Sequence, residues 1–201
     1  DGQIGGQLNM ARVIPGKEEF HGLVEWFETM LARSSVAVKL NTRATPQALE
    51  GFDDVILASG VVPRDPQIPT AEGAQVLTYI DVLRGGAKVG KRVAVVGAGG
   101  IGFDVAEFLV HQGVSPTLDL AEWKQEWGVG DPSETPGGLT APHPPAPARD
   151  VVLLQRKAER PGKRLGKTTG WIHRASLTSR GVKMLGGVSY EAITAEGIVL
   201  G

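Results

Sequence analysis

The twelve residues from Lys91 to Gly102, KRVAVVGAGGIG, decide the fold. The apolar run over residues 91–96 predicts a buried parallel strand, and the amphipathic stretch from about Ile101 to Gln112 predicts a helix. The G-x-G-x-x-G motif between them is a weak signal alone, but a strand before it and a helix after it are typical of a dinucleotide-binding turn. We therefore predict an α/β protein with a Rossmann-like, three-layer NAD(P)-binding domain around a parallel sheet.

Each glycine of this motif has a physical role. Gly97 permits a tight turn, Gly99 lets the backbone approach a pyrophosphate, and Gly102 lets the helix pack closely on the strand. The helix N-terminus adds free N–H donors and a partial positive charge for the phosphates. The predicted cofactor-binding stretch comprises Gly97, Ala98, Gly99, Gly100, Ile101 and Gly102.

The next predicted strand, residues 150–154, bears on the choice between NAD and NADP. An NAD site places an acid at the end of this strand to bind the ribose 2′-hydroxyl. Here the strand is followed by Gln155, Arg156 and Lys157. A 2′-phosphate would pair with a guanidinium and an ammonium, so these residues favour NADP(H) over NAD(H). The alternative is that Arg156 and Lys157 are solvated surface charges.

Arg156 and Lys157 begin a basic segment in a chain whose net charge is only −1. Gly166-Lys167-Thr168 resembles the end of a phosphate-binding P-loop, but Pro161 stands where that motif needs its first glycine. Lys167 is therefore assigned to a basic lip around the dinucleotide. Because aromatic residues are few, we expect no nucleic-acid partner. The segment's basic residues are Arg156, Lys157, Arg160, Lys163, Arg164, Lys167, Arg174, Arg180 and Lys183, against one acid, Glu159.

The rest of the chain predicts further helices and strands. The apolar spacing of residues 18–33 predicts an amphipathic helix. The glycine- and proline-rich stretch 114–149 is predicted to be an irregular surface insertion, in which Trp123 and Trp127 could stack a ligand but are better explained by packing. The other predicted elements are strands at 36–40, 54–59, 182–185, 190–194 and 198–200, a helical turn at 45–49, and a helix at 171–179.

Several function classes lack the residues they need. The chain has no cysteine, which excludes thiol chemistry and iron–sulfur ligation within it. Its four histidines lack metal-ligand spacing, and no G-x-S-x-G motif is present, so we predict neither a metal site nor a catalytic side chain. No apolar run is long enough to cross a bilayer, and we expect a cytoplasmic protein with no membrane partner.

Four longer stretches carry a family resemblance: GGQLNMARVIPGKEEF, DDVILASGVVPRDP, VLTYIDVLRGGAKVGKRVAVVGAGGIGFDVAEFL and LLQRKAERPGKRLGKTTGWIHR. The chain resembles the C-terminal half of the bacterial NADPH-dependent 2,4-dienoyl-CoA reductases, iron–sulfur flavoproteins related to trimethylamine dehydrogenase. The resemblance implies an NADPH domain inserted into an FAD domain, with residues 1–75 forming part of the FAD-binding α/β domain and residues 76–201 the NADP-binding domain. It also implies an FMN-bearing barrel with a 4Fe–4S cluster earlier in the parent protein, so that this chain is an internal fragment that is not fully active alone.

The resemblance further assigns flavin-side residues. Gln7 and Lys17 match positions that contact FAD, Ala44 matches a position near the adenine, and Ser59-Gly60 matches a turn that closes against FAD. The implied function is an electron-input module that passes hydride from NADPH to FAD for the reduction of an unsaturated fatty acyl-CoA. Two alternatives stay open: the NADPH-to-FAD input subunit of another flavoprotein, such as a glutamate synthase small subunit, and a non-catalytic dinucleotide sensor.

Overall fold

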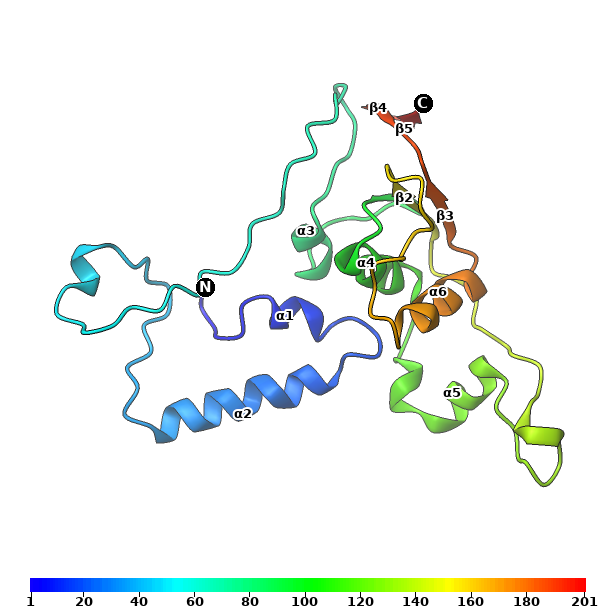
Figure 1. The fold of residues 1–201 in the computed structure, drawn as a ribbon, viewed down its shortest axis with the longest axis horizontal. Coiled ribbons are helices and arrows are strands. Elements are labelled where there is room, and N and C mark those ends of the chain that lie inside the picture. The colour runs from blue at the N-terminus through cyan, green and yellow to red at the C-terminus, as the bar shows by residue number, and fades with distance from the viewer.

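A three-stranded parallel sheet forms the centre of the protein, in a computed structural model that describes residues 1–201 (Figure 1). Its strands are β1 (Arg92–Val96), β2 (Asp150–Gln155) and β3 (Lys183–Gly186), in the order β1-β2-β3. Helix α4 (Gly100–Val110) connects β1 to β2, and α6 (Gly170–Ser179) connects β2 to β3. The predicted α/β class and the parallel Rossmann-type sheet are confirmed.

The main core lies between this sheet and its two crossover helices. Residues on a strand alternate between faces, so Val151 and Leu153 of β2 point to the same side, where they pack with Ala106 and Leu109 of α4. Leu177 of α6 is fully buried in the same cluster. The central position of β2 explains its apolar sequence, because both of its edges pair with neighbours.

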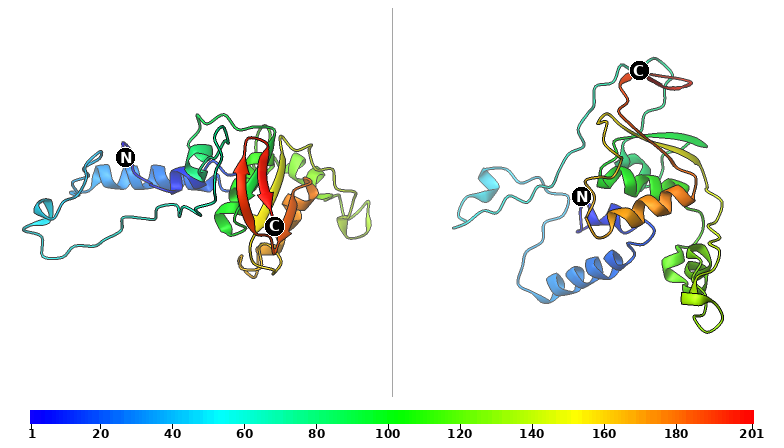
Figure 2. Two further views of the ribbon diagram at one scale, coloured as in Figure 1. Left: turned by 90° about the horizontal axis from the view of Figure 1, so that it is seen from above. Right: turned by 45° about the vertical axis from the view of Figure 1, so that its right-hand side comes forward.

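A two-stranded antiparallel ribbon, β4 (Tyr190–Thr194) and β5 (Gly197–Leu200), follows the sheet at the C-terminal end. Residue Thr70 bridges to Ile193, so the chain before α3 (Tyr79–Leu83) runs back to the ribbon. Helix α3 begins with a capping box between Thr78 and Asp81 and contacts α4. Figure 2 shows the ribbon rising beyond the end of the parallel sheet.

The first part of the chain contains α1 (Leu8–Ala11), α2 (Glu19–Arg33) and the short 3-10 helix η1 (Gln47–Leu49). The predicted helix at 18–33 and the helical turn at 45–49 are therefore confirmed. The predicted strands at 36–40 and 54–59 are wrong, because both stretches are irregular. Ile56 is 89% and Leu57 is 85% exposed. No strand lies beside either stretch, and an extended chain gains its hydrogen bonds only from a neighbouring strand.

The insertion 114–149 contains more regular structure than its composition predicts: η2 (Pro116–Leu118), α5 (Leu120–Trp127) and η3 (Pro136–Gly138). Helix α5 begins where the Asp119 carboxylate accepts hydrogen bonds from the amides of Ala121 and Glu122. It ends at Gly128, whose φ of 68° lies in the left-handed region. None of the helices is long and apolar enough to cross a membrane.

Candidate functional site

The glycine-rich turn joins β1 to α4 with the geometry that the motif predicts. Gly97 has a φ of 111°, which suits glycine, and its amide donates to the Leu154 carbonyl oxygen over 2.9 Å. A Cβ atom at Gly102 would overlap the carbonyl oxygen of Gly97 and would contact the Leu153 side chain. Gly102 therefore allows the first turn of α4 to pack against its own strand.

The N-terminus of α4 is open. Gly99 is the N-cap residue, and no side chain caps the helix. The amides of Gly99, Gly100, Ile101 and Gly102 donate to no side chain and to no loop carbonyl. A Cβ at Gly99 or Gly100 would meet nothing within 4 Å. Four free amides beside empty space at a helix N-terminus suit a phosphate group.

Two variable positions of the glycine motif carry side chains, and these side chains differ in burial. Ala98 is buried in the core cluster, whereas Ile101 is 47% exposed. The structure therefore gives Ala98 a packing role and leaves the Ile101 side chain at the surface beside the open helix end.

Two basic residues without an acidic partner follow β2, the strand beside β1. Val96 of β1 pairs in register with Leu154 of β2, so both strands reach the same edge of the sheet. Arg156 and Lys157 come directly after β2 and are exposed, and neither has a carboxylate within ion-pair distance. The Glu159 carboxylate, the only acid of the basic segment, is within 3.5 Å of Lys163 Nζ and 3.2 Å of Arg164 Nε.

Lys167 is likewise exposed and without an acidic partner, in the loop before α6. Its ammonium group is therefore available to an anion, as expected for a residue of the basic lip predicted around the dinucleotide.

Gln155 holds the loop that carries these cations, a role that sequence reasoning missed. Its Nε2 atom donates to the carbonyl oxygens of Lys157 over 3.0 Å and Glu159 over 2.8 Å. The amide of Gly187 also donates to the Lys157 carbonyl over 2.9 Å. Tyr190 of β4 lies near Arg156: burial raises the pKa of the Tyr190 hydroxyl, and the positive charge of Arg156 opposes this rise.

The predicted flavin-side residues are not gathered into one site. Gln7 Nε2 donates to the Val61 carbonyl over 3.4 Å, which places Gln7 near Gly60. Ala44, Ser59 and Gly60 are exposed in irregular chain and form no hydrogen bond with Gln7 or Lys17. The structure thus brings Gln7 close to Gly60 but not to Lys17, and the role of these five positions in flavin binding stays a prediction.

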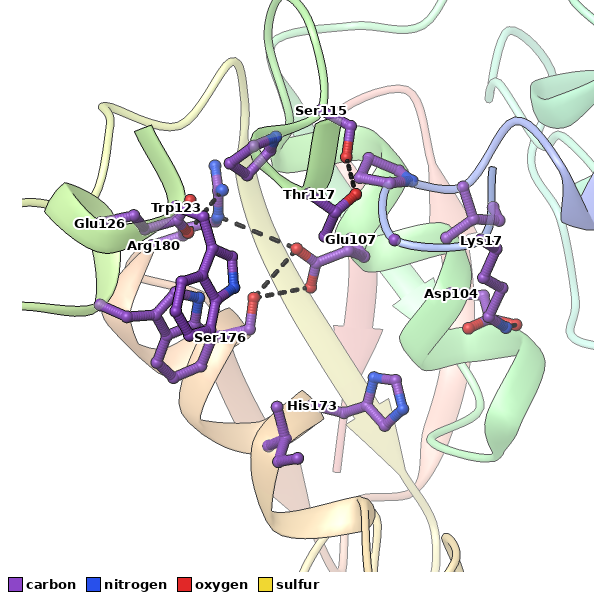
Figure 3. A pocket seen from close by; sticks show the side chains of 16 residues that line it. Lys17, Asp104, Glu107, Ser115, Thr117, Trp123, Glu126, His173, Ser176 and Arg180 are labelled. Atoms are coloured by element: carbon purple, nitrogen blue, oxygen red, sulfur yellow. Dashed lines mark hydrogen bonds and ion pairs between the residues drawn. The ribbon is translucent and has the colours of Figure 1, made fainter. Parts of the chain in front are cut away.

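Lys17 lies instead against α4, where its Nζ atom is 2.6 Å from Asp104 Oδ2. This ion pair borders a cavity of about 170 Å³ beside α4, α5 and α6 (Figure 3). The Glu107 carboxylate lies at the cavity, and the Ser176 hydroxyl is 3.0 Å from each of its oxygens. Burial raises the pKa of the Glu107 carboxyl, and the Ser176 hydroxyl and Arg180 only partly offset this effect.

The raised pKa of Glu107 predicts how this residue affects stability. The folded protein binds the Glu107 proton more tightly than the unfolded chain, so its contribution to the free energy of unfolding is greatest at acidic pH. This contribution is lost as the pH rises through the folded-state pKa. Glu107→Gln, which stays neutral, should therefore raise the melting temperature at pH 7 and have less effect at pH 4, measured by thermal unfolding. A lower melting temperature of the variant at pH 7 would contradict this.

Three comparisons with known proteins show what this chain is similar to. The family model described as pyridine nucleotide-disulphide oxidoreductase matches residues 12–200. A metal reductase of Desulforamulus reducens is 30% identical over 98% of this chain, and a cinnamate reductase of Clostridium sporogenes is 33% identical over 59% of it. The structure of a 2-naphthoyl-CoA reductase complex superposes with a TM-score of 0.70 at 18% identity over 98% of the chain.

The chain spans only part of these proteins. It covers 30% of the metal reductase, 18% of the cinnamate reductase and 25% of the 2-naphthoyl-CoA reductase chain. The similarity therefore concerns one region of larger reductases.

Proposed function

Because this chain belongs to the pyridine nucleotide-disulphide oxidoreductase family, we propose that it is the electron-input module of a larger NADPH-dependent flavoprotein oxidoreductase. In this function the chain binds NADPH and positions it so that hydride passes to FAD. Family membership implies binding of flavin and pyridine nucleotide. The choice of NADPH over NADH and the reaction of the whole protein are parts of the proposal.

One observation supports this function most strongly: the open N-terminus of α4 lies at the same sheet edge as unpaired cations. The free amides of Gly99 to Gly102 would receive the pyrophosphate, and the close approach at Gly102 brings this helix end against β1. Arg156 and Lys157 would bind the 2′-phosphate, and Lys167 would add positive charge to the rim. These residues fit the dinucleotide in charge and in available donors.

The residues of this chain bind and orient, and none is proposed as an acid or a base. NADPH supplies the hydride when it is bound, and the protein contributes position and electrostatics. The loop after β2 is suited to orienting a ligand, because hydrogen bonds from Gln155 and from the Gly187 amide hold the backbone that carries Arg156 and Lys157. A rigid loop lowers the entropic cost of binding a phosphate.

The substrate proposal concerns the whole parent protein. We infer a 2,4-dienoyl-CoA reductase type of reaction, the reduction of an unsaturated fatty acyl-CoA, with FMN and a 4Fe–4S cluster in a barrel domain outside this chain. Its support is the resemblance of the sequence to that family, together with the metal reductase and the cinnamate reductase among the matched proteins. The flavin would complete its site with residues of the parent protein as well as Gln7 and Lys17.

Isotope transfer in the full-length parent protein tests the proposed function. NADPH deuterated at the transferring position should reduce the bound flavin with a measurable isotope effect, and flavin absorbance should bleach in the same reaction. Nucleotide binding without bleaching would instead indicate a sensor. Bleaching by NADH at the same rate and affinity would contradict the NADPH preference but not the flavoprotein function.

The motif glycine at position 99 offers a sharp binding test. Gly99→Ala should fold normally, because the added Cβ would meet nothing within 4 Å and the backbone φ there is −88°. The methyl group would occupy the space that the pyrophosphate needs, so we expect NADP⁺ affinity to fall by roughly tenfold or more. Calorimetric titration measures this. Gly90→Ala, which adds the same methyl group in the exposed loop before β1, at the opposite end of that strand, should keep the affinity of the unchanged protein, and an equal loss in both variants would refute the assignment.

A further inference from the structure

The β4–β5 ribbon begins at the sheet edge that carries the cations after β2. Strands β2 and β3 are parallel and in register up to Gln155 and Gly186, so both strands end at this edge. The chain continues from Gly186 into the ribbon, which Figure 2 shows rising beyond the end of the sheet. The first residues of the ribbon therefore lie where the 2′-phosphate is proposed to bind.

Two backbone hydrogen bonds hold the start of the ribbon against the loop after β2. The Gly187 amide donates to the Lys157 carbonyl oxygen over 2.9 Å, and the Val188 amide donates to the Gln155 carbonyl oxygen over 3.2 Å. Arg156 lies between the two residues that accept these bonds. Its backbone is therefore fixed beside the chain that leads into β4.

Tyr190 is the first residue of β4, and its side chain lies on the opposite face of the ribbon from its two neighbours. A Cβ atom at Gly201 would meet both Ser189 Oγ and Glu191 Oε1, so the Ser189 and Glu191 side chains share one face. Side chains alternate between faces along a strand, which puts Tyr190 on the other face. The positive charge of Arg156 reaches the Tyr190 hydroxyl there, and it opposes the rise in pKa that burial causes.

The Tyr190 hydroxyl is available to a ligand. The structure gives it no hydrogen-bond partner, whereas the hydroxyl of Tyr79, the other tyrosine of this chain, is 3.5 Å from Gln7 Oε1. Arg156 is likewise without an acidic partner. A phenol donor and a guanidinium that are both unpaired match an anion with several acceptor oxygens.

Packing alone accounts poorly for a tyrosine at this position. Tyr79 packs against the main core, but Tyr190 is not among the residues that do so. Its ring is half-buried at the start of the ribbon, where a phenylalanine would fill the same space. The hydroxyl therefore calls for a partner from outside the chain.

We propose that Tyr190 contacts the 2′-phosphate of NADP(H), with its hydroxyl donating to a phosphate oxygen beside the Arg156 guanidinium. This inference rests on the proposed function, and it extends the nucleotide site from the loop after β2 to the start of β4. NAD(H) has a neutral hydroxyl at the same position and offers the phenol no charged acceptor. Tyr190 therefore raises the preference for NADP(H) over NAD(H).

Tyr190→Phe tests the contact, because it removes the hydroxyl and keeps the ring. In calorimetric titrations of the full-length parent protein, NADP⁺ affinity should fall by roughly tenfold, because a hydrogen bond to a charged group is lost. NAD⁺ affinity should stay unchanged. Tyr79→Phe is the matched control, since it removes the same group from α3 and should leave both affinities as they are. Unaltered NADP⁺ affinity in Tyr190→Phe would overturn the proposal, as would an equal loss for both nucleotides.

Two nucleotide fragments separate this inference from the proposed function. Adenosine 2′,5′-bisphosphate carries the 2′-phosphate, 5′-AMP lacks it, and neither can donate a hydride. The bisphosphate should bind more weakly to Tyr190→Phe than to the unchanged protein, while 5′-AMP should bind both equally. If Arg156→Asp lost bisphosphate affinity and Tyr190→Phe did not, the inference on Tyr190 alone would fail. If the unchanged protein bound the bisphosphate no more tightly than 5′-AMP, the proposed NADPH preference would fail with it.

Discussion

Gly102→Ala should destabilise the protein by about 3 kcal/mol and abolish dinucleotide binding. The new Cβ would overlap the carbonyl oxygen of Gly97, a backbone atom that cannot rotate away as a side chain can. Relief therefore requires α4 to move away from β1, and α4 contributes much of the main core, including the fully buried Ala106 and Leu109. Urea unfolding followed by circular dichroism measures the loss.

Gly100→Ala is the matched control for this prediction. It adds the same methyl group to the same helix two residues earlier, where the Cβ would meet nothing within 4 Å. Alanine also has a higher helix propensity than glycine, so stability should be equal or slightly higher. If Gly102→Ala unfolded at the same urea concentration as Gly100→Ala, the close packing of α4 on β1 would be refuted.

Arg156→Asp should change the nucleotide preference by roughly 100-fold, through a loss of NADPH affinity with a much smaller change for NADH. The guanidinium has no carboxylate partner in the protein, so its charge is available to a 2′-phosphate. An aspartate at this position would repel that phosphate, whereas it could accept a hydrogen bond from the 2′-hydroxyl of NADH. Titrations of the variant with NADPH and with NADH measure the ratio.

The control for Arg156→Asp is Lys88→Asp, which makes the same charge reversal in an exposed loop before β1, at the opposite end of the strands. It should leave the preference unchanged, which separates a local contact from the overall change in net charge. Equal losses of NADPH and NADH affinity in Arg156→Asp would defeat the 2′-phosphate assignment.

The parallel-sheet unit could be predicted from the sequence because its signals are local. The apolar run before Gly97 and the helical pattern after it lie within one short stretch, and β2 is a similarly apolar run. Residues 54–59 have the same composition but form no strand, because pairing depends on a neighbour that local sequence does not reveal. Helix α5 could have been found from its cap residues, Asp119 and Gly128, despite the glycine and proline around it.

The dinucleotide site and the cavity at Glu107 also differ in how far the sequence predicts them. The glycine turn and Arg156 follow from motif spacing and from the position of β2, so sequence reasoning locates them. The cavity at Glu107 is different, because Lys17, Glu126 and Arg180 come from distant parts of the chain and meet only in the fold. The sequence does not predict the role of Gln155 either, since its side chain contacts backbone carbonyls and no side-chain motif describes such contacts.

Binding of NADP⁺ at the glycine turn is the central claim, and amide chemical shifts of the isotope-labelled protein test it most directly. On titration with NADP⁺, the largest shifts should fall on the amides of Gly97 to Gly102 and on Arg156 and Lys157. Titration with NAD⁺ should reproduce the shifts at the turn but not those at the two cations. Shifts confined to other parts of the chain, or none at saturating NADP⁺, would contradict the account.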